Sequence, residues 1–374
     1  MRRAGSARVP TWTAALGGSS CRCHWYASCM EIRELGATEL AVSVFGLGTM
    51  TFGAESDEVT SHSILDHYFE DGGRFVDTAD VYSRGVSEEI VGRWLVSRSN
   101  RDQIVLTTKA RFPMADGPGW SGAGRDYLPR AIDASLRRLQ TDHLDLYQMH
   151  AWDPEVPIDE TLGVLGEFVA DGKVRYIGVS NYTGWQIERA VAAARVLGVG
   201  PIASLQPQYN LLVRDIELEV LPAAMENGLG VLPWSPLGGG WLTGKYSPVE
   251  RPTGATRLGE DPSRGVEAYD RRNQDRTWCI LETVREIATA RQATMSQVAL
   301  NWVRNRHAVS SVLLGVRTVE QLTDNMAALT WNLEPEEMHE LTRVSAPGIP
   351  DYIQVLQKNT GMDVWRRLGT GRPT

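Results

Sequence analysis

The sequence lacks a long apolar run, and it lacks an excess of basic residues. No window approaches the roughly 20 continuous apolar residues of a membrane-spanning helix. The formal net charge of −8 gives no general attraction to nucleic acid or to anionic lipid. We therefore expect no nucleic-acid partner, no membrane association and a cytoplasmic location. The sequence does not reveal the oligomeric state.

Cysteine is scarce outside the first thirty residues. The main part of the chain contains only Cys279, so disulfides cannot build its fold. The spacing C-x-C-H-x4-C near the start is similar to a set of metal ligands, but no second ligand pair follows at the spacing of a zinc site. We therefore expect no metal. The remaining cysteines are Cys21, Cys23 and Cys29.

Residues 1–29 differ in composition from the rest of the chain. They carry four arginines and no acidic residue, as transit peptides do, but they lack the apolar core of a secretory signal. Patterned sequence begins at Met30. We interpret residues 1–29 as a disordered leader, or as sequence that precedes the true translation start.

From Met30 onward, short apolar runs alternate with amphipathic stretches. This alternation is typical of βαβ units and of a parallel sheet. Thr183 or Gly184 is expected to begin one of the helices, and Gly198 to end it. The apolar runs predict strands over residues 42–48, 74–79, 103–109, 144–150, 174–180, 202–206, 230–235 and 310–315. The amphipathic stretches predict helices over residues 57–70, 86–98, 126–139, 158–171, 185–197, 215–227 and 278–306.

Eight strands are the number that a closed barrel needs. A doubly wound sheet usually carries a G-x-G-x-x-G fingerprint after its first strand, and GLGTMTFG does not match that pattern. We therefore predict an α/β fold, a (β/α)8 TIM barrel over residues 30–345. Turn residues 36–38 predict an N-terminal β-hairpin at the floor of the barrel. The long loop 244–277 and the tail 346–374 are expected to bind cofactor or substrate, with the tail near the substrate pocket.

Ionisable side chains stand where consecutive predicted strands end. Asp77 and Tyr82 follow the second strand, Lys109 ends the third, and His150 ends the fourth. Each alone is compatible with a capping or rim residue, but active sites of barrels collect at these strand ends. We expect the Lys109 ammonium to lower the pKa of Tyr82, and Asp77 to keep Lys109 charged. Together the four residues predict a proton donor for a carbonyl oxygen, with His150 as a further hydrogen-bond partner.

Seven motifs resemble those of a known protein family, and they follow one another along the chain in the same order as in that family. They are DTADVYSRGVSEEIVG, LTTKA, DLYQMH, IGVSN, LQPQYN, WSPLGGGWLTGKY and SVLLGVRTVEQLTDN. They resemble the aldo-keto reductase superfamily, from about residue 31 to residue 345. Within it they are most similar to the branch of bacterial aryl-alcohol-dehydrogenase-like enzymes and potassium channel β-subunits. The resemblance implies NADPH-dependent reduction of an aldehyde or ketone to an alcohol. It assigns the catalytic tetrad to Asp77, Tyr82, Lys109 and His150, with Tyr82 as proton donor.

The resemblance also implies where NADPH binds. Ser180, Asn181 and Gln206 would hold the nicotinamide carboxamide, and Trp234 would stack on the ring. Thr49, Met50 and Asp77 would line the nicotinamide and substrate pocket, although Met50 also suits a role as core filler. The pyrophosphate would lie against Ser235, Pro236, Leu237, Gly238, Gly240 and Lys245. The adenosine half would contact Arg257, Gly315, Arg317, Gln321, Asp324 and Asn325.

Two of these segments have competing interpretations. Gly239-x4-Gly244-Lys245 begins like a Walker A loop, but Tyr246 replaces the required Ser or Thr, and a pyrophosphate suits the same glycines and lysine. Arg257 and Arg317 favour NADPH, because guanidinium groups bind the 2′-phosphate. Asp324 would instead favour NADH by accepting a ribose hydroxyl, and with Gln321 it also fits a solvated helix face.

Two other functions fit part of the sequence. A non-catalytic or weakly catalytic NADPH-binding regulatory module is compatible with the same resemblance. An isomerase or lyase is disfavoured, because no metal-ligand cluster accompanies the barrel pattern. The partner is expected to be a small carbonyl compound, whose identity the sequence does not reveal. Trp120 and Trp152 either line an aromatic pocket or pack beneath the loops.

Overall fold

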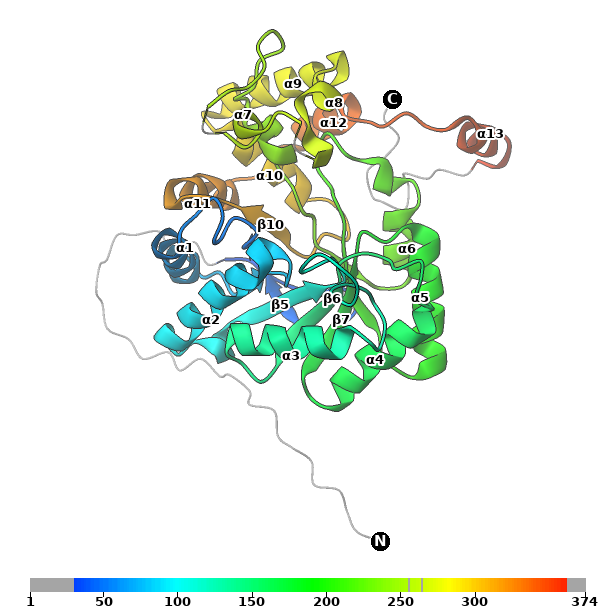
Figure 1. Ribbon diagram of the computed structural model, residues 1–374. Helices are drawn as coiled ribbons and strands as arrows, with labels where there is room; N and C mark the ends of the chain where they lie inside the picture. The colour runs from blue at the N-terminus through cyan, green and yellow to red at the C-terminus, as the bar shows by residue number, and fades with distance from the viewer. Residues whose placement is uncertain (1–29, 255, 264, 362–374) are drawn as a thin grey trace, which may run out of the picture.

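The computed structural model describes residues 30–254, 256–263 and 265–361 (Figure 1). The predicted barrel is confirmed. Eight parallel strands form one sheet in the order β10-β3-β4-β5-β6-β7-β8-β9, so consecutive strands are neighbours, as βαβ units require. The strands are β3 (Phe45–Gly48), β4 (Phe75–Asp77), β5 (Val105–Ala110), β6 (Leu144–Met149), β7 (Val174–Ser180), β8 (Ile202–Gln206), β9 (Gly230–Val231) and β10 (Val312–Gly315).

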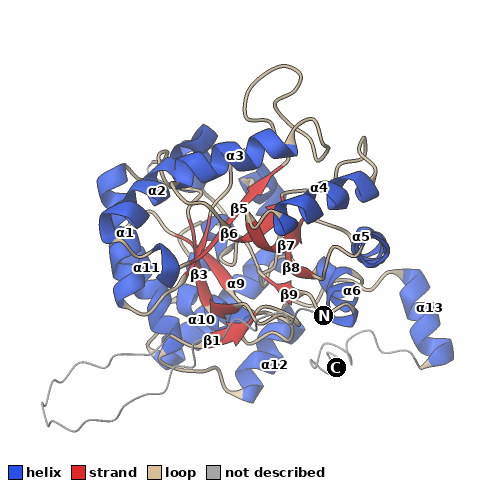
Figure 2. Cartoon of the chain, turned by 90° about the horizontal axis from the view of Figure 1, so that it is seen from below, coloured by secondary structure: helices blue, strands red, loops and turns tan. Residues whose placement is uncertain are grey.

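The two ends of this sheet meet. Val231 of β9 forms a parallel bridge with Val309, just before β10. The backbone N–H of Leu313 donates to the carbonyl of Pro233 at 3.0 Å. The strands therefore surround a common interior, and Figure 2 shows the helices placed around them.

Helices follow the strands along the chain. One set covers the barrel: α1 (Glu58–Glu70), α2 (Val86–Arg98), α3 (Leu128–Leu139), α4 (Ile158–Ala170), α5 (Gly184–Leu197), α6 (Val220–Glu226), α10 (Met295–Arg304) and α11 (Val319–Met326). The others are α7 (Arg257–Glu260), α8 (Tyr269–Arg272), α9 (Asp275–Arg291), α12 (Pro335–Val344) and α13 (Asp351–Thr360). The short 3-10 helices are η1 (Tyr82–Gly85), η2 (Arg101–Gln103), η3 (Asp215–Glu217), η4 (Gly238–Thr243), η5 (Gly265–Glu267) and η6 (Ala327–Leu329).

The expected ends of α5 are confirmed. The Thr183 side chain accepts from the backbone at Gln186, whose side chain accepts in return from the backbone N–H of Thr183. Gly198 closes the helix with a left-handed φ of 68°. Glycine adopts that conformation without a steric penalty, which is why it often follows the last turn of a helix.

Two of the predicted elements are wrong, because each corresponds to two separate elements in the structure. Residues 42–48 do not form one strand: a bend at Val44 separates hairpin strand β2 from barrel strand β3. Residues 278–306 do not form one helix: Gln292 adopts a left-handed φ of 53°, and α10 begins anew after Thr294. The Thr294 side chain accepts from the N–H of Gln297, and this cap stabilises the second start.

Two more predicted elements are shorter than expected, and both contain a proline. Strand 230–235 is regular only in β9, because Pro233 has no N–H to donate to a ladder. Helix 215–227 divides into η3 and α6, since Pro222 fits only within the first turn of a helix. Helix α12 was not expected at all.

The predicted hairpin is present and closes one end of the barrel. Strands β1 (Ile32–Glu34) and β2 (Ala41–Ser43) pair in antiparallel register. A Cβ at Gly36 would lie 2.3 Å from the Gly228 carbonyl oxygen, so only glycine permits this approach of the turn. The apolar residues between and within these strands pack into the interior of the barrel. This cluster consists of Leu35, Leu40, Val42, Phe75, Leu146, Ala203, Leu232 and Leu313.

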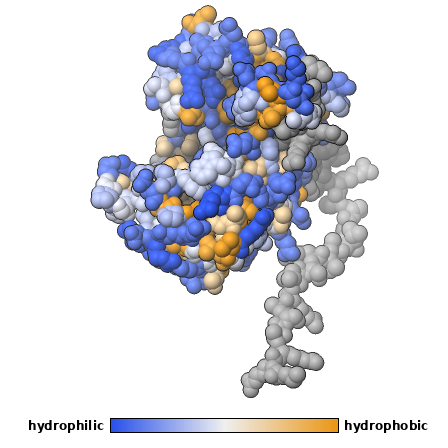
Figure 3. All heavy atoms as spheres, turned by 90° about the vertical axis from the view of Figure 1, so that its right-hand side faces the viewer, coloured by the Kyte–Doolittle hydropathy of each residue, from blue (hydrophilic) through white to orange (hydrophobic). Residues whose placement is uncertain are grey.

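One face of the molecule is mainly polar. Figure 3 shows a largely hydrophilic face with hydrophobic residues in small groups. Within the described part of the chain, no helix combines the length and the apolar character that crossing a membrane requires. Helix α13 extends away from the barrel in Figure 1, and none of its residues lines the pocket described below. A position of the tail near the substrate pocket therefore stays a prediction.

Candidate active site

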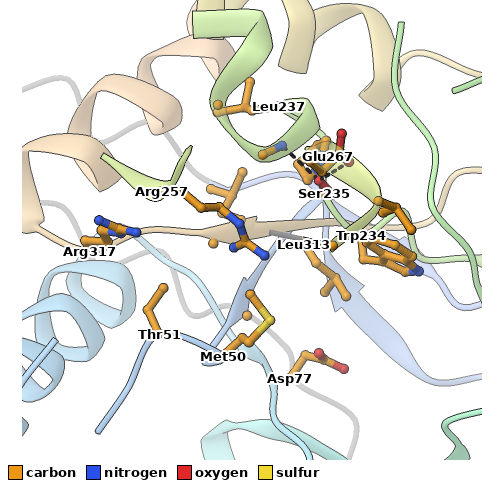
Figure 4. Close-up of a pocket in the computed structure, with 18 of the residues that line it drawn as sticks. Met50, Thr51, Asp77, Trp234, Ser235, Leu237, Arg257, Glu267, Leu313 and Arg317 are labelled. Carbon is orange, nitrogen blue, oxygen red and sulfur yellow. Dashed lines mark hydrogen bonds between the residues drawn. The ribbon is translucent and has the colours of Figure 1, made fainter. Parts of the chain in front are cut away.

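A cavity of about 930 Å³ opens where the strands end and the loop after β9 begins (Figure 4). Most of the residues expected to act on substrate or cofactor line it. They are Met50, Asp77, Tyr82, His150, Ser180, Asn181, Gln206, Trp234, Ser235, Pro236, Leu237, Gly240, Lys245, Arg257, Gly315, Arg317, Gln321, Asp324 and Asn325. The other three, Thr49, Lys109 and Gly238, do not line the cavity itself.

Three residues of the expected tetrad are hydrogen-bonded to one another, and the fourth, His150, packs beside them. The Nζ of Lys109 donates to Asp77 Oδ2 at 2.7 Å and to the Tyr82 hydroxyl at 3.4 Å. It also donates to the carbonyl of Thr78 at 2.7 Å. The rings of Tyr82 and His150 meet edge to face, with centroids 5.9 Å apart. The phenol therefore has an ammonium on one side and an imidazole on the other.

Burial and charge set the protonation of this group. Burial opposes the ammonium of Lys109, but Asp77 and Tyr82 outweigh it, so the pKa of Lys109 lies above its usual value. Burial raises the pKa of Asp77, against the opposing effect of Lys109. Burial and the positive charge of Lys109 both hold the pKa of His150 well below its usual value, so this imidazole is neutral at neutral pH.

The expected pKa of Tyr82 is wrong in its net direction. Lys109 does lower it, but burial of the ring is the larger effect and raises the pKa above its ordinary value. The sequence shows which charge is near the phenol, but it does not show how completely the ring is removed from water. Tyr82 therefore stays protonated at neutral pH.

A layer of side-chain amides lies beneath Asp77: it contains Gln206, which was expected to bind the nicotinamide, and Gln148, which was not anticipated. Gln206 Nε2 donates to Asp77 Oδ1 at 2.9 Å, and Gln148 Nε2 approaches the same oxygen at 3.4 Å. Gln148 in turn accepts from Ser204 Oγ at 3.1 Å. Gln148 precedes His150 by two residues and therefore faces the same side of the strand. A polar residue at that spacing was the signal that could have revealed it.

The residues expected around the nicotinamide interlock with one another. Asn181 Nδ2 donates to the carbonyl of His150 at 2.9 Å, and Trp234 Nε1 donates to Asn181 Oδ1 at 3.0 Å. Ser180 Oγ donates to the carbonyl of Gln206 at 2.8 Å. Asn181 has a positive φ of 58°, a conformation that asparagine tolerates better than most residues. These bonds fix the indole of Trp234 at the edge of the pocket.

The loop after β9 brings a second unanticipated residue, Glu267, into the pocket. Its carboxylate accepts from Ser235 Oγ at 3.1 Å and from Arg272 Nε at 3.3 Å, and also from Gln208 Nε2. Figure 4 shows Glu267 directly beside Ser235. It lies in a loop without periodicity, so no local pattern marks it. Glu267 links the distal part of the loop to the ends of β8 and β9.

Three cations lie at the other end of the cavity. Burial, together with the positive charges of Arg317 and Arg257, lowers the pKa of Lys245, so both guanidinium groups act on this ammonium. Arg317 forms ion pairs with Glu55 and Glu260, each at 3.5 Å. The loop wraps tightly here: a Cβ at Gly240 would lie 2.6 Å from Lys245 Nζ, and Gly240 has a φ of 94°.

Asp324 both lines the cavity and bonds to a neighbouring helix. It accepts from Thr294 Oγ1 at 3.1 Å and from Gln297 Nε2 at 2.8 Å. These bonds connect α11 to the start of α10. The solvated helix face considered for Asp324 is therefore an incomplete description, because its carboxylate bridges two helices.

Phe112, a residue that no sequence pattern singled out, forms a wall of the pocket. Its ring packs on His150 with centroids 4.5 Å apart. Trp152 instead packs against Tyr182 and Trp185, each with centroids 5.3 Å away, and Trp120 is exposed. Neither Trp120 nor Trp152 lines the cavity. The aromatic side chains of the pocket therefore include Phe112 and Trp234.

Metal ligands do not gather in the part of the chain that the structure describes. No group of three or more His, Cys, Asp or Glu side chains is arranged there to hold an ion. The motif containing Cys21, Cys23 and Cys29 lies outside the described residues.

Comparison with known proteins supports the predicted family. The model of the Aldo/keto reductase family matches residues 44–346. The chain is 36% identical over 324 residues to the uncharacterized oxidoreductase YrpG of Bacillus subtilis, covering 84% of this chain and 96% of YrpG. It is 34% identical over 314 residues to norsolorinic acid reductase of Aspergillus flavus, covering 80% and 77% of the two chains. Protein tas of Escherichia coli is 32% identical over 352 residues, covering 84% and 97%. With a family match over most of its length and relatives named as oxidoreductases, this chain belongs to the aldo/keto reductase family and is an oxidoreductase.

Proposed function

We propose that the protein reduces an aldehyde or ketone to an alcohol with NADPH, and that Tyr82 donates the proton. The observation that supports this proposal is the hydrogen-bonded series from Asp77 through Lys109 to the Tyr82 hydroxyl, since Asp77 and Tyr82 line a large pocket. A phenol alone is a poor acid at neutral pH. A fixed ammonium beside it stabilises the tyrosinate that proton transfer leaves behind.

The four residues divide the work. Tyr82 stays protonated until the carbonyl oxygen gains negative charge, and then transfers its proton to that oxygen. Asp77 holds Lys109, which keeps the ammonium directed at the phenol. His150 is neutral, so one ring N–H can donate to the same oxygen without adding a second positive charge. Phe112 and Trp234 restrict the access of water to the reacting atoms.

The pocket residues also fit a dinucleotide. Amide and hydroxyl groups of Ser180, Asn181 and Gln206 lie at the end that contains Trp234, whereas cations lie at the other end. Figure 4 shows Arg317 and Trp234 on opposite sides of the pocket, with the side chain of Arg257 between them. NADPH, when bound, supplies the hydride. Arg257 and Arg317 would hold its 2′-phosphate, because guanidinium groups form paired, charge-assisted bonds with phosphate oxygens.

The decisive experiment replaces the proton donor. Tyr82→Phe should abolish the consumption of NADPH with a panel of aryl and alkyl aldehydes, ketones and keto-sugars. NADPH binding, measured by the quenching of tryptophan fluorescence, should change little, since only the hydroxyl is removed. Near-native turnover in the variant would refute the mechanism. A wild-type protein that binds NADPH but reduces no carbonyl would instead support the regulatory module.

A further inference from the structure

A second group of buried ionisable side chains lies beside the tetrad, toward α2 and α3. We call it the Asp80 cluster; it consists of Asp80, Glu88, Tyr127, Arg138 and Tyr147. Asp80 is 1% exposed, and Glu88 and Tyr147 are fully buried. The mechanism proposed above uses none of these residues. Buried carboxyl groups are costly to ionise unless they are paired, so this cluster requires an explanation.

The backbone fixes Asp80 relative to the tetrad. Asp80 lies in the short segment that joins Asp77 to Tyr82. Its N–H donates to the carbonyl of Lys109 at 3.0 Å, and the N–H of Tyr82 donates to Ala79 at 3.1 Å. The segment that carries the proposed proton donor therefore also carries the buried carboxyl group.

The cluster contains two carboxyl groups and one cation. The negative charge of Glu88 is compensated by close donors: Glu88 accepts from Arg138 Nε and from Thr108 Oγ1, each at 2.6 Å. Gly85 makes room for the arginine, since a Cβ there would lie 2.8 Å from Arg138 Cδ. When both carboxyl groups are ionised, one negative charge is in excess.

Asp80 receives less compensation than Glu88. The Tyr127 hydroxyl donates to Asp80 Oδ2 at a longer distance, 3.3 Å. Asp80 Oδ1 and the Tyr147 hydroxyl, both buried, have no hydrogen-bond partner among the described residues. The excess charge therefore falls on Asp80.

The electrostatics agree with this geometry. Burial, followed by the negative charge of Glu88, raises the pKa of Asp80 to about 7. The Val81 N–H, Arg138 and Tyr127 oppose this rise without cancelling it. The negative charge of Asp80 also affects the tetrad. Burial is the largest effect on the pKa of Tyr82 and raises it; Lys109 lowers this pKa, whereas Asp77 and Asp80 raise it further. Charged and titratable groups that face Asp80 thus come from α2, α3, β6, η1 and the residue before α3.

We propose that Asp80 is a positioning residue for the proton donor: by binding or releasing a proton inside this cluster, it sets how readily Tyr82 gives up its own. The inference rests on the proposed function. On the acid side of neutrality Asp80 is uncharged, and Tyr82 is the stronger acid. On the alkaline side the Asp80 carboxylate disfavours the tyrosinate, and carbonyl reduction slows. The reaction therefore depends on a buried group that touches neither substrate nor cofactor.

The test compares the pH profiles of wild type and Asp80→Asn, which stays uncharged at every pH. We expect the ratio of kcat for Asp80→Asn over wild type to rise with pH, with a midpoint near neutrality. A nearby buried charge changes the acidity of a phenol by about tenfold. That corresponds to about threefold in kcat when the proton is about half transferred in the transition state. Asp133→Asn, on the exposed side of α3, removes a carboxylate without touching the cluster and should give a constant ratio.

Two further variants shift the midpoint in opposite directions and do not depend on the folding of Asp80→Asn. Tyr127→Phe removes a donor that favours the Asp80 carboxylate, so the kcat inflection should move to higher pH. Glu88→Gln removes a negative charge, so the inflection should move to lower pH. A pH-independent kcat ratio, or movement of both midpoints in the same direction, would overturn the proposal.

A measurement without turnover separates this proposal from the proposed function. The pKa of Tyr82 can be measured as the difference in tyrosinate absorbance between chains with and without Tyr82. It should be lower in Asp80→Asn than in the wild type, whether or not a carbonyl is reduced. An unchanged pKa of Tyr82 would refute the role of Asp80. A lower pKa in a protein that reduces no carbonyl would refute only the proposed function.

Discussion

The two ends of the pocket are built in different ways. The end with the tetrad comes from consecutive strands β4, β5 and β6. Its charges are buried and bonded to one another: Lys109 is completely buried, and Asp77 accepts from Lys109, Gln206 and Gln148. The end with the cations comes from the loop after β9 and the start of α11. There Arg317, just before α11, pairs at 3.5 Å with Glu260 of the loop after β9, and the side chain of Glu260 is about half exposed.

This difference indicates two physical tasks. A buried ion pair is expensive to break, because separation leaves an uncompensated charge in a medium of low dielectric constant. The tetrad therefore keeps one geometry before any ligand arrives. A partly exposed ion pair contributes only about 0–1 kcal/mol, so an incoming phosphate can replace Glu260 at little cost. We infer that the tetrad end is organised in advance, whereas at the cation end Arg317 can exchange Glu260 for a phosphate on binding.

The largest expected effect tests the organised end. Lys109→Met should lower kcat by several orders of magnitude, because the tyrosinate loses its stabilising cation while the side-chain volume is nearly kept. Steady-state kinetics across a pH range would measure this loss. Lys173→Met, which removes a partly exposed lysine paired with Asp133, is the matched control. Recovery of full activity at a different pH optimum would contradict the role given to Lys109.

A smaller effect is expected at the cation end. Arg257→Ala and Arg317→Ala should each raise the Kd of NADPH by roughly one to two decades, since a charge-assisted bond contributes about 1.5–3 kcal/mol. The Kd of NADH should hardly change, because NADH has no 2′-phosphate. Fluorescence titration with both cofactors would measure the difference. Arg251→Ala, in the same loop but paired with Asp270, should leave both values unchanged.

If both cofactors were weakened equally in Arg257→Ala or Arg317→Ala, the assignment of the 2′-phosphate to these arginines would be wrong. A wild type that prefers NADH would contradict it as well. The cation end of the pocket would then bind only the pyrophosphate, which NADPH and NADH share, and it would not distinguish the two cofactors.

The amide layer under Asp77 provides a more moderate test of preorganisation. Gln148→Met keeps the length of the side chain but removes its donor and acceptor, so kcat should fall by about tenfold, the effect of about 1.4 kcal/mol. KM should stay nearly constant, because Gln148 does not line the cavity. Ser204→Ala, which removes only the bond to Gln148, should have a smaller effect in the same direction. A change in KM alone would exclude a positioning role for Gln148.

The smallest effect is expected for residues 1–29, which include none of the residues assigned to either end of the pocket. A chain that begins at Met30 should retain its melting temperature and its kcat, because residues 1–29 have no apolar periodicity and contain none of the proposed site residues. Calorimetry and kinetics on the two chains would test this. A large loss of stability would show that residues 1–29 pack on the barrel.

The sequence by itself determined the strand count, the barrel and the four residues at the ends of its strands. The reason is local: strand and helix periodicities are properties of short windows, and strand ends in a parallel barrel converge on one face whatever the details of packing. The break between α9 and α10 at Gln292 was missed, because the left-handed conformation of this residue depends on the helix cap that follows it. The bend at Val44 was missed because hairpin and barrel strands share one apolar run.

Only the tertiary structure decided the electrostatics and the distant partners. The pKa of Tyr82 depends on how completely its ring is buried, which no window of sequence contains. Glu267 meets Ser235 across 32 residues, and Gln206 meets Asp77 across 129. The excess charge of the Asp80 cluster exists only because α2 and α3 bring Glu88 and Arg138 together. Burial and long-range contacts are properties of the packed chain, so they could be derived only from the three-dimensional structure.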